Sequence, residues 1–166
     1  MKSLVFFTVP RTGGSIFTEI IHELLKEHLK ILEVEKDYYD KGNLTSENQI
    51  ERLGAIANIS SEIVKALFSG KPHIIGPLRE TSSLYPLLSG TLTEILGKDL
   101  AVIVITRHPF DLIKSWYHAR HLHPLVHATK HKDFRSYARH FLANEQIFMD
   151  GFTTSINISR DLLGHA

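Results

Sequence analysis

The sequence predicts an α/β protein in which a mainly parallel sheet carries helices on both faces. Two observations lead to this fold class. Four short segments have the character of strands, and each is followed by a segment with helical features. The runs "SLVFFTV" (3–9) and "DLAVIVIT" (99–106) are almost continuously apolar, as expected of strands buried on both faces. Strands that alternate with helices indicate parallel pairing.

The first half of the chain follows this alternation. The strand at 3–9 leads through a glycine turn into a helix over 15–29, whose apolar residues recur at helical spacing. The segment "ILEVE" (31–35) alternates between apolar and polar residues and predicts a second strand. The polar residues 36–47 predict a flexible excursion. Residues 48–69 predict a helix in which a serine of "NISS" is a candidate cap for a second segment.

The second half repeats the pattern. A proline opens the short predicted strand 71–76, and a mostly helical segment follows at 82–97. Pro86 and Gly90 are expected to bend or split that helix. Pro109 stands where the first residue of the next helix belongs.

The remaining segments predict an amphipathic helix within 133–149 and a short closing helix within 155–166. With 166 residues, the chain has room for one domain with a substantial core, so we assign residues 1–166 to a single domain. No internal repeat or linker interrupts it.

Composition excludes several classes of function. The formal charge is +1, so no global field favours nucleic acid or an anionic membrane as a partner. The chain has no cysteine, which excludes disulfides, thiolate zinc sites and cysteine nucleophiles and fits a reducing, cytoplasmic location. No apolar run approaches the roughly 18 residues of a membrane span, and "MKSLVFFTV" is interpreted as a strand rather than a signal peptide. The composition leaves the oligomeric state open.

The first candidate site is the turn "VPRTGGS" after the first strand. Gly13 and Gly14 allow the backbone to fold closely around an anion, and the following helix presents unpaired N–H groups at its positive end. Arg11 adds a permanent charge, and Thr12 and Ser15 add hydroxyl donors. The alternative is a corner in which the glycines serve only the turn. No lysine follows the glycines, so this is not a Walker loop.

The second candidate site is "RHPFDLIKS", which follows the strand at 99–106. Arg107 comes directly off that strand, and Ser115 lies eight residues later on the helix that Pro109 opens. Together they could bind one phosphate group. The alternative is that Arg107 pairs with Asp111 and that Ser115 is an ordinary surface residue. Because both corners follow parallel strands, they are expected at one edge of the sheet, where they could bind a ligand with two separated phosphates.

The ordered pair of motifs resembles the sulfotransferase family. "PRTGGSIF" is similar to its 5′-phosphosulfate loop, and "RHPFDLIKS" is similar to its 3′-phosphate motif, in which a serine follows the arginine by eight residues. "SWYH" (115–118) is similar to a sequence often found there. The resemblance spans roughly residues 3–120 and implies a P-loop-NTPase-like three-layer sandwich. The nucleotide-binding residues that it implies are Arg11, Thr12, Gly13, Gly14, Ser15, Ile16, Arg107 and Ser115.

The resemblance implies transfer of a sulfuryl group from 3′-phosphoadenosine 5′-phosphosulfate (PAPS) to a hydroxyl or amine of a small-molecule or glycan acceptor. The product nucleotide is 3′-phosphoadenosine 5′-phosphate (PAP), and no metal is required. Arg11 stands where the family has a lysine and would stabilise charge on the bridging oxygen. Many relatives place a histidine base where this chain has Pro77. Glu80 is the candidate base, with His73 nearby; alternatively, Glu80 only pairs with Arg79 or a helix end.

Other interpretations stay open. A P-loop-like nucleotide phosphotransferase or kinase would use ATP and Mg²⁺, and a degenerate relative would bind a nucleotide without catalysis. The chain is shorter than most relatives, which fits a fragment or a minimal version. A histidine-rich stretch is interpreted as a solvated loop, with acceptor contact as the functional alternative, because no carboxylate completes a metal-ligand pattern. Its histidines are His118, His121, His123, His127 and His131.

Overall fold

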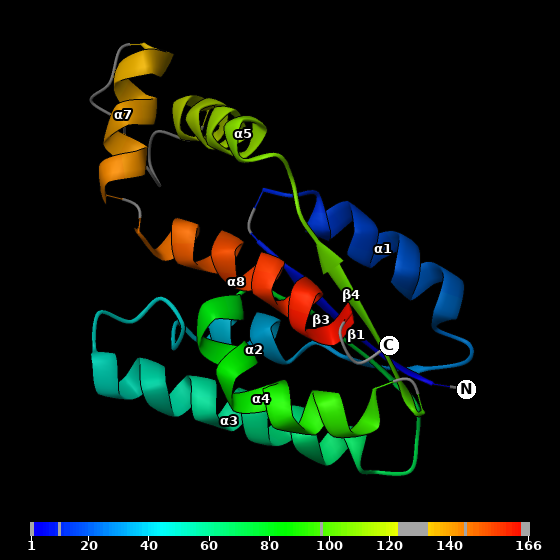
Figure 1. Ribbon diagram of the computed structural model, residues 1–166. Helices are drawn as coiled ribbons and strands as arrows, with labels where there is room; N and C mark the ends of the chain where they lie inside the picture. Colours follow the sequence, from blue (N-terminus) through cyan, green and yellow to red (C-terminus); the bar gives the residue numbers. More distant parts are fainter. Residues whose placement is uncertain (1, 10, 97, 123–132, 145, 164–166) are drawn as a thin grey trace.

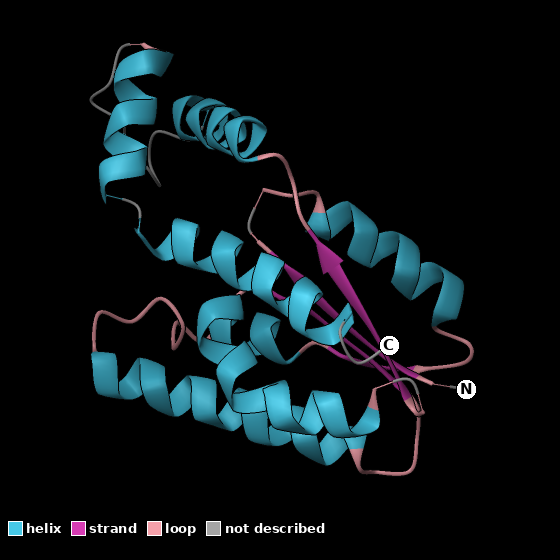
Figure 2. Ribbon diagram, in the orientation of Figure 1, coloured by secondary structure: helices cyan, strands magenta, loops and turns pink. Residues whose placement is uncertain are grey.

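A four-stranded, all-parallel sheet with helices on both faces forms the centre of the molecule (Figures 1 and 2), which confirms the predicted fold class. The computed structural model describes residues 2–9, 11–96, 98–122, 133–144 and 146–163. The strands are β1 (Ser3–Thr8), β2 (Lys30–Leu32), β3 (His73–Leu78) and β4 (Leu100–Ile105). The helices are α1 (Gly14–Leu25), α2 (Val34–Asp40), α3 (Gln49–Leu67), α4 (Thr81–Ile95), α5 (Pro109–Leu122), α7 (Phe134–Asn144) and α8 (Gln146–Leu163).

The strand order β2-β3-β1-β4 places β1 between β3 and β4. Thr8, the last residue of β1, is paired in register with Ile105, the last residue of β4. On the other side, Phe7 is paired with Leu78, the last residue of β3. The three strands therefore end together, and the loops that follow them meet at one edge of the sheet.

The residues of β1 alternate between two cores, as the pleat of a strand requires. Val5 and Phe7 pack into the larger core with residues of α2, α3, α4 and α8. Phe6 packs on the opposite face with Ile74 of β3 and with the apolar side of α1. Both faces of β1 are thus buried, which explains its continuous apolar sequence.

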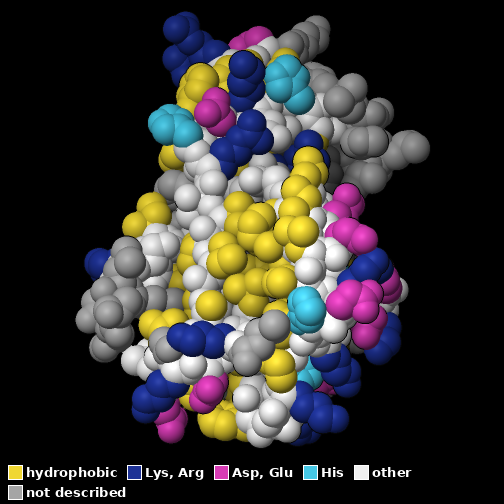
Figure 3. Space-filling view, turned by 90° about the vertical axis from the view of Figure 1, so that its right-hand side faces the viewer, with side chains coloured by type: hydrophobic (Ala, Val, Ile, Leu, Met, Phe, Trp, Pro, Cys, Tyr) yellow, Lys and Arg dark blue, Asp and Glu magenta, His cyan; other side chains and the backbone are white. Residues whose placement is uncertain are grey.

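The outer surface of α1 is unusually apolar. Ile16, Ile20 and Leu24 recur at helical spacing, and 67%, 52% and 67% of these side chains are exposed. Figure 3 views the molecule from the side on which α1 lies and shows apolar side chains gathered across the middle of that face. Part of the apolar pattern of α1 therefore lies on its exposed side, and not on the side that packs against the sheet.

Helices α5 and α7 lie beyond the carboxyl end of β4 and form a small core of their own (Figure 1). That core contains Ile113, Tyr137 and Phe141. Helix α8 then returns to pack on α4, where the Tyr85 hydroxyl donates a hydrogen bond to Asp161 at 3.4 Å. Pro109 is the first residue of α5, as predicted.

Two predictions in the first half are wrong. The strand predicted over 31–35 ends at Leu32, and α2 begins at Val34 within that segment and continues into the predicted excursion. Five alternating residues are too few to exclude a helix, and Val34 is buried in the helical arrangement. Helix α3 continues through "NISS" without a break, and Ser60 is buried on its inner side and does not cap a second helix.

The second half also departs from prediction at element boundaries. Helix α4 is a single helix despite Pro86. The predicted helices at 133–149 and 155–166 are replaced by α7, which ends at Asn144, and α8, which begins at Gln146. No helix within the described ranges has the length and apolar character needed to cross a bilayer.

Candidate functional site: an anion-binding cavity and the cavity beside it

The loop between β1 and α1 is shaped by Thr12. Its backbone N–H donates to the Val9 carbonyl oxygen at 3.2 Å, and its hydroxyl donates to the same oxygen at 2.6 Å. The Thr8 hydroxyl lies 2.6 Å from the Thr12 hydroxyl. Thr12 is therefore occupied with contacts inside the loop, and it is not among the residues that line the neighbouring cavity.

The two glycines of this loop serve different purposes. Gly13 is the N-cap of α1 and has φ of 91°, in the left-handed region that favours glycine. At Gly14, a Cβ atom would lie 2.6 Å from the Thr8 hydroxyl oxygen, so a larger residue would force the Thr8 side chain to move. The first hydrogen bond of the helix runs from the Phe17 N–H to the Gly13 carbonyl, which leaves the preceding N–H groups without intrahelical partners.

Arg11 also has a left-handed backbone, with φ of 72°. A residue with a Cβ atom pays about 1–2 kcal/mol in this conformation. Such strain is concentrated at ligand-binding and catalytic sites. Arg11 lies in the turn between β1 and α1 and is exposed to solvent.

Arg107 follows β4 and reaches the first loop. Its Nη1 atom donates a hydrogen bond to the Arg11 carbonyl oxygen at 3.1 Å. Ser115 lies on the following helix and lines the same cavity. The ion pairs among the described residues do not include one between Arg107 and Asp111. The hydrogen bond from Arg107 to Arg11 instead connects the two corners of the predicted site directly.

These groups surround one cavity of about 470 Å³. Its described lining residues are Thr8, Val9, Arg11, Gly13, Gly14, Ser15, Ile16, Arg79, Arg107 and Ser115. Three of them are arginines and none is a carboxylate. Within the described residues, none of the three guanidinium groups forms an ion pair. The cavity therefore concentrates positive charge that protein carboxylates leave unneutralised, which favours an anionic ligand.

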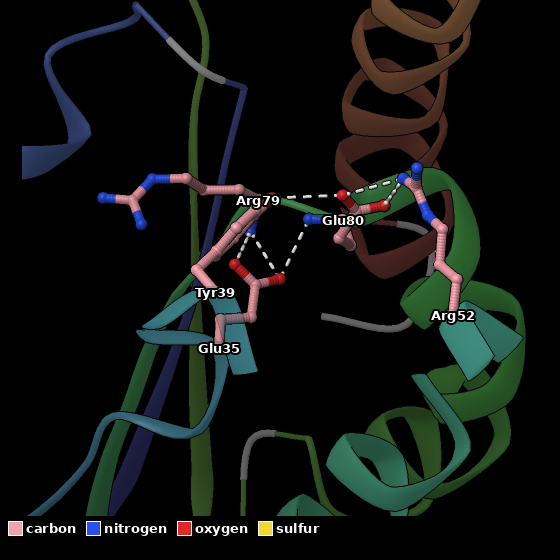
Figure 4. Close-up of polar contacts among 5 residues, drawn as sticks. All are labelled: Glu35, Tyr39, Arg52, Arg79 and Glu80. Carbon is pink, nitrogen blue, oxygen red and sulfur yellow. Dashed lines mark hydrogen bonds and ion pairs between the residues drawn. The ribbon is translucent and has the colours of Figure 1, made fainter. Parts of the chain in front are cut away.

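Arg79 was missed by sequence reasoning. It follows β3, and the strand order brings the end of β3 beside the end of β1. In Figure 4 its side chain extends away from Glu35 and Glu80. The residue lines this candidate anion-binding cavity and also the cavity beside it. A basic residue at the end of a short strand was a signal, but strand order was needed to interpret it.

Glu80, the predicted base, is engaged elsewhere (Figure 4). Its carboxylate pairs with the Arg52 guanidinium of α3 at 2.9 Å and accepts a hydrogen bond from the Tyr39 hydroxyl at 3.1 Å. It lines neither cavity at the carboxyl ends of β1 and β3. The partner is thus Arg52, not Arg79, and the structure does not bring Glu80 together with Arg11.

Glu35 is a buried carboxylate that sequence reasoning also missed. It is 2% exposed, and it accepts hydrogen bonds from the backbone N–H groups of Arg79 and Glu80 at 2.7–2.9 Å. Burial raises the pKa of Glu35 from 4.5 to about 7, and the two backbone donors oppose part of that rise. The sequence signal was a second glutamate within an otherwise apolar segment.

Glu35 belongs to the wall of a second cavity of about 430 Å³. This cavity lies between α1, the start of α2 and the end of β3, and Pro77 is part of its wall. Ser15 and Arg79 line both cavities. The arginine-lined cavity, a candidate anion-binding cavity, therefore adjoins a second cavity whose wall contains a carboxyl group with a pKa near neutrality.

The histidines do not join this site as a group. His73 is buried in β3, where its Nδ1 atom lies 2.7 Å from the Lys71 carbonyl oxygen. His118 lines a separate cavity with aromatic residues of α5 and α7. His123, His127, His131 and the side chain of His121 lie outside the described part of the chain. Among the described side chains, no cluster has three potential metal ligands.

Comparison of the chain with protein-family models, with curated proteins and with solved structures gave no match.

Proposed function

We propose that this protein binds PAPS and transfers its sulfuryl group to an acceptor. The observation that carries the proposal is the single cavity that contains the glycine loop, Arg107 and Ser115. The N–H groups at the start of α1 suit a terminal phosphosulfate. Arg107 and Ser115 suit a second, separate phosphate. The proposed ligand has two separate anionic groups, one for each of these two sets of donors.

The charges of the cavity favour this donor over ATP with Mg²⁺. A Mg²⁺–nucleotide site usually offers the metal a carboxylate, and the described lining residues offer none. Three arginines instead line the cavity. Arginine binds phosphate and sulfate oxygens through a planar set of donors and keeps its charge at any physiological pH.

Arg11 is the proposed catalytic cation. As the S–O bond to the 5′-phosphate breaks, negative charge grows on the bridging oxygen, and a guanidinium beside it lowers the barrier. Arg79 adds a second cation at the boundary of the two cavities. The cysteine-free chain fits a reaction in the cytoplasm.

Thermal unfolding in the presence of PAP or ATP–Mg²⁺ tests the nucleotide class. We expect PAP to raise the Tm of the wild type, by an amount that grows with the ratio of ligand concentration to Kd. Arg107→Ala should lose most of this stabilisation. Arg160→Ala is the matched control, because Arg160 is exposed on α8 and pairs only with its neighbour Asp161 among the described residues.

Stabilisation by ATP–Mg²⁺ in preference to PAP would contradict the proposal. A protein that binds PAP but transfers no sulfuryl group from PAPS to hydroxyl or amine compounds would be a nucleotide-binding protein without catalysis. Formation of a sulfated product together with PAP would support the enzymatic assignment.

A further inference from the structure

We infer that the second cavity is the acceptor site, that it takes a small uncharged compound bearing a hydroxyl group, and that Glu35 accepts the hydroxyl proton. This inference rests on the proposed function, because it concerns the partner of the same transfer reaction. It adds a substrate class and a catalytic residue that the anion-binding cavity alone does not indicate.

The position of the second cavity supports the inference. It shares Ser15 and Arg79 with the anion-binding cavity, so a molecule in one chamber lies next to a molecule in the other. Ser15 is in the first turn of α1, whose N-terminus is the proposed site of the transferred group. An in-line transfer needs the acceptor oxygen on the far side of that group from the nucleotide.

The hydrogen bonds of Glu35 leave room for a ligand. Its Oε1 atom accepts two backbone N–H groups, at 2.8 and 2.9 Å, which uses both lone pairs of that oxygen. Its Oε2 atom accepts the same Arg79 N–H at 2.7 Å, so this donor is shared between the two oxygens. Within the described residues, Oε2 therefore retains a lone pair that can accept an acceptor hydroxyl. The hydrogen bonds from the backbone N–H groups of Arg79 and Glu80 fix the carboxylate at the wall of the cavity (Figure 4).

His22 belongs to the same wall and contains a polar atom without a partner among the described residues. Its Nε2 atom is shielded from solvent and has no hydrogen-bond partner among the described residues. A buried polar atom without a partner is costly, by about 1–3 kcal/mol. Its Nδ1 atom lies 3.6 Å from Glu33. A compound bound in this cavity would lie beside the His22 ring, so the carbon-bound ring protons can report its binding.

The charges around the cavity select against an anion. Three glutamates line it, Glu19, Glu33 and Glu35, against the two cations Lys36 and Arg79. Glu33 pairs with Lys36 at 3.5 Å, and Arg79 also lines the donor cavity. An anionic acceptor would face the remaining carboxylates and the negative charge of the donor. A protonated amine lacks the lone pair that attack requires, which leaves an uncharged hydroxyl as the favoured nucleophile.

The proposed step balances without another reactant. The hydroxyl proton of the acceptor passes to Glu35 Oε2 while the acceptor oxygen forms a bond to sulfur. The bond between sulfur and the bridging oxygen breaks, and its electron pair stays on the 5′-phosphate. The products are a sulfate ester, PAP and protonated Glu35, which returns its proton to water. A pKa of about 7 leaves Glu35 substantially ionised at neutral pH.

Phenol and benzoate are the probes for the acceptor site, because they have similar shapes but differ in charge. Each is titrated into the PAP-saturated protein while NMR follows the carbon-bound ring protons of His22. We expect phenol to shift these resonances and benzoate to bind at least about tenfold more weakly. Glu19→Trp fills the cavity from an exposed position and should abolish the phenol shift. Glu23→Trp is the control, since Glu23 is exposed on the same helix and lines neither cavity.

The role of Glu35 is tested by the rate of phenyl sulfate formation from PAPS. Glu35→Gln should lower kcat by about 10²- to 10⁴-fold, as expected for loss of a general base, while the Kd for PAP stays within about threefold of the wild type. Glu23→Gln should match the wild type. The kcat of the wild type should rise with pH through about 7, and circular dichroism should show that Glu35→Gln is folded.

The outcomes separate this inference from the proposed function. Absence of PAP binding in the wild type would contradict the proposed function itself. PAP binding without a phenol shift at His22, or with equal binding of benzoate, would contradict the acceptor assignment. Phenol binding without transfer, or transfer that Glu35→Gln leaves intact, would contradict the catalytic role of Glu35.

Discussion

At the scale of single residues, Glu35 connects the stability of the protein with its proposed chemistry. Its carboxylate joins α2 to the turn between β3 and α4 through the N–H groups of Arg79 and Glu80. The same burial that excludes water from this contact raises the pKa of Glu35 to about 7. The residue therefore favours its protonated form, although the two N–H donors favour the ionised one.

A pH dependence of stability follows from this shift. Because the pKa of Glu35 is higher in the folded state than in the unfolded state, its stabilising effect is complete below pH 4.5 and is lost as pH rises through about 7. Urea unfolding at several pH values should show that the wild type loses up to about 3 kcal/mol relative to Glu35→Gln across this window. Parallel pH profiles for the two proteins would contradict the shifted pKa.

At the scale of elements, the loop between β1 and α1 combines close packing with backbone strain. Gly14 lies against Thr8, and Arg11 occupies a left-handed conformation. The hydrogen bonds of Thr12 to Val9 tighten the turn that places both residues. A loop fixed in this way presents its N–H groups to a ligand with little further loss of entropy on binding.

Substitution of Gly14 by alanine tests that packing. The new Cβ would approach the Thr8 side chain to 2.6 Å, so Gly14→Ala should lower the free energy of unfolding by about 1–3 kcal/mol. In a Thr8→Ala background the same substitution should cost much less, because the two closest atoms are gone. Gly54→Ala in α3 meets no atom within 4 Å and should stabilise by about 0.4–1 kcal/mol. An equal cost of Gly14→Ala in both backgrounds would show that the Thr8 contact is not responsible.

The elements differ in how well the sequence predicts them. The strands at β1 and β4 are long, continuous and apolar, and both are where the sequence predicts them, apart from the end residues. The segment 31–35 misleads because its alternation is short, and because Glu35 is polar yet buried through contacts with residues more than forty positions away. A local sequence pattern carries no information about a contact between residues so far apart in the chain.

At the scale of the whole molecule, the order of the strands creates the site. Local sequence identifies Arg11, Arg107 and Ser115, and the sheet places them around one cavity. Arg79 and Glu35 enter the site only because β3 pairs with β1 and because α2 packs beside the end of β3. Glu80, one residue after Arg79, faces Arg52 instead. Motifs therefore identified most residues of the first cavity, and topology was needed to find those of the second cavity.

The central claim is that one cavity binds two separated phosphate groups, with Arg107 at the 3′-phosphate. Calorimetric Kd values for PAP and for adenosine 5′-monophosphate, which lacks the 3′-phosphate, test it in the wild type and in Arg107→Ala. We predict that the 3′-phosphate strengthens binding to the wild type by at least about tenfold and that this advantage largely disappears in Arg107→Ala. The same advantage in both proteins, or none in the wild type, would contradict the claim.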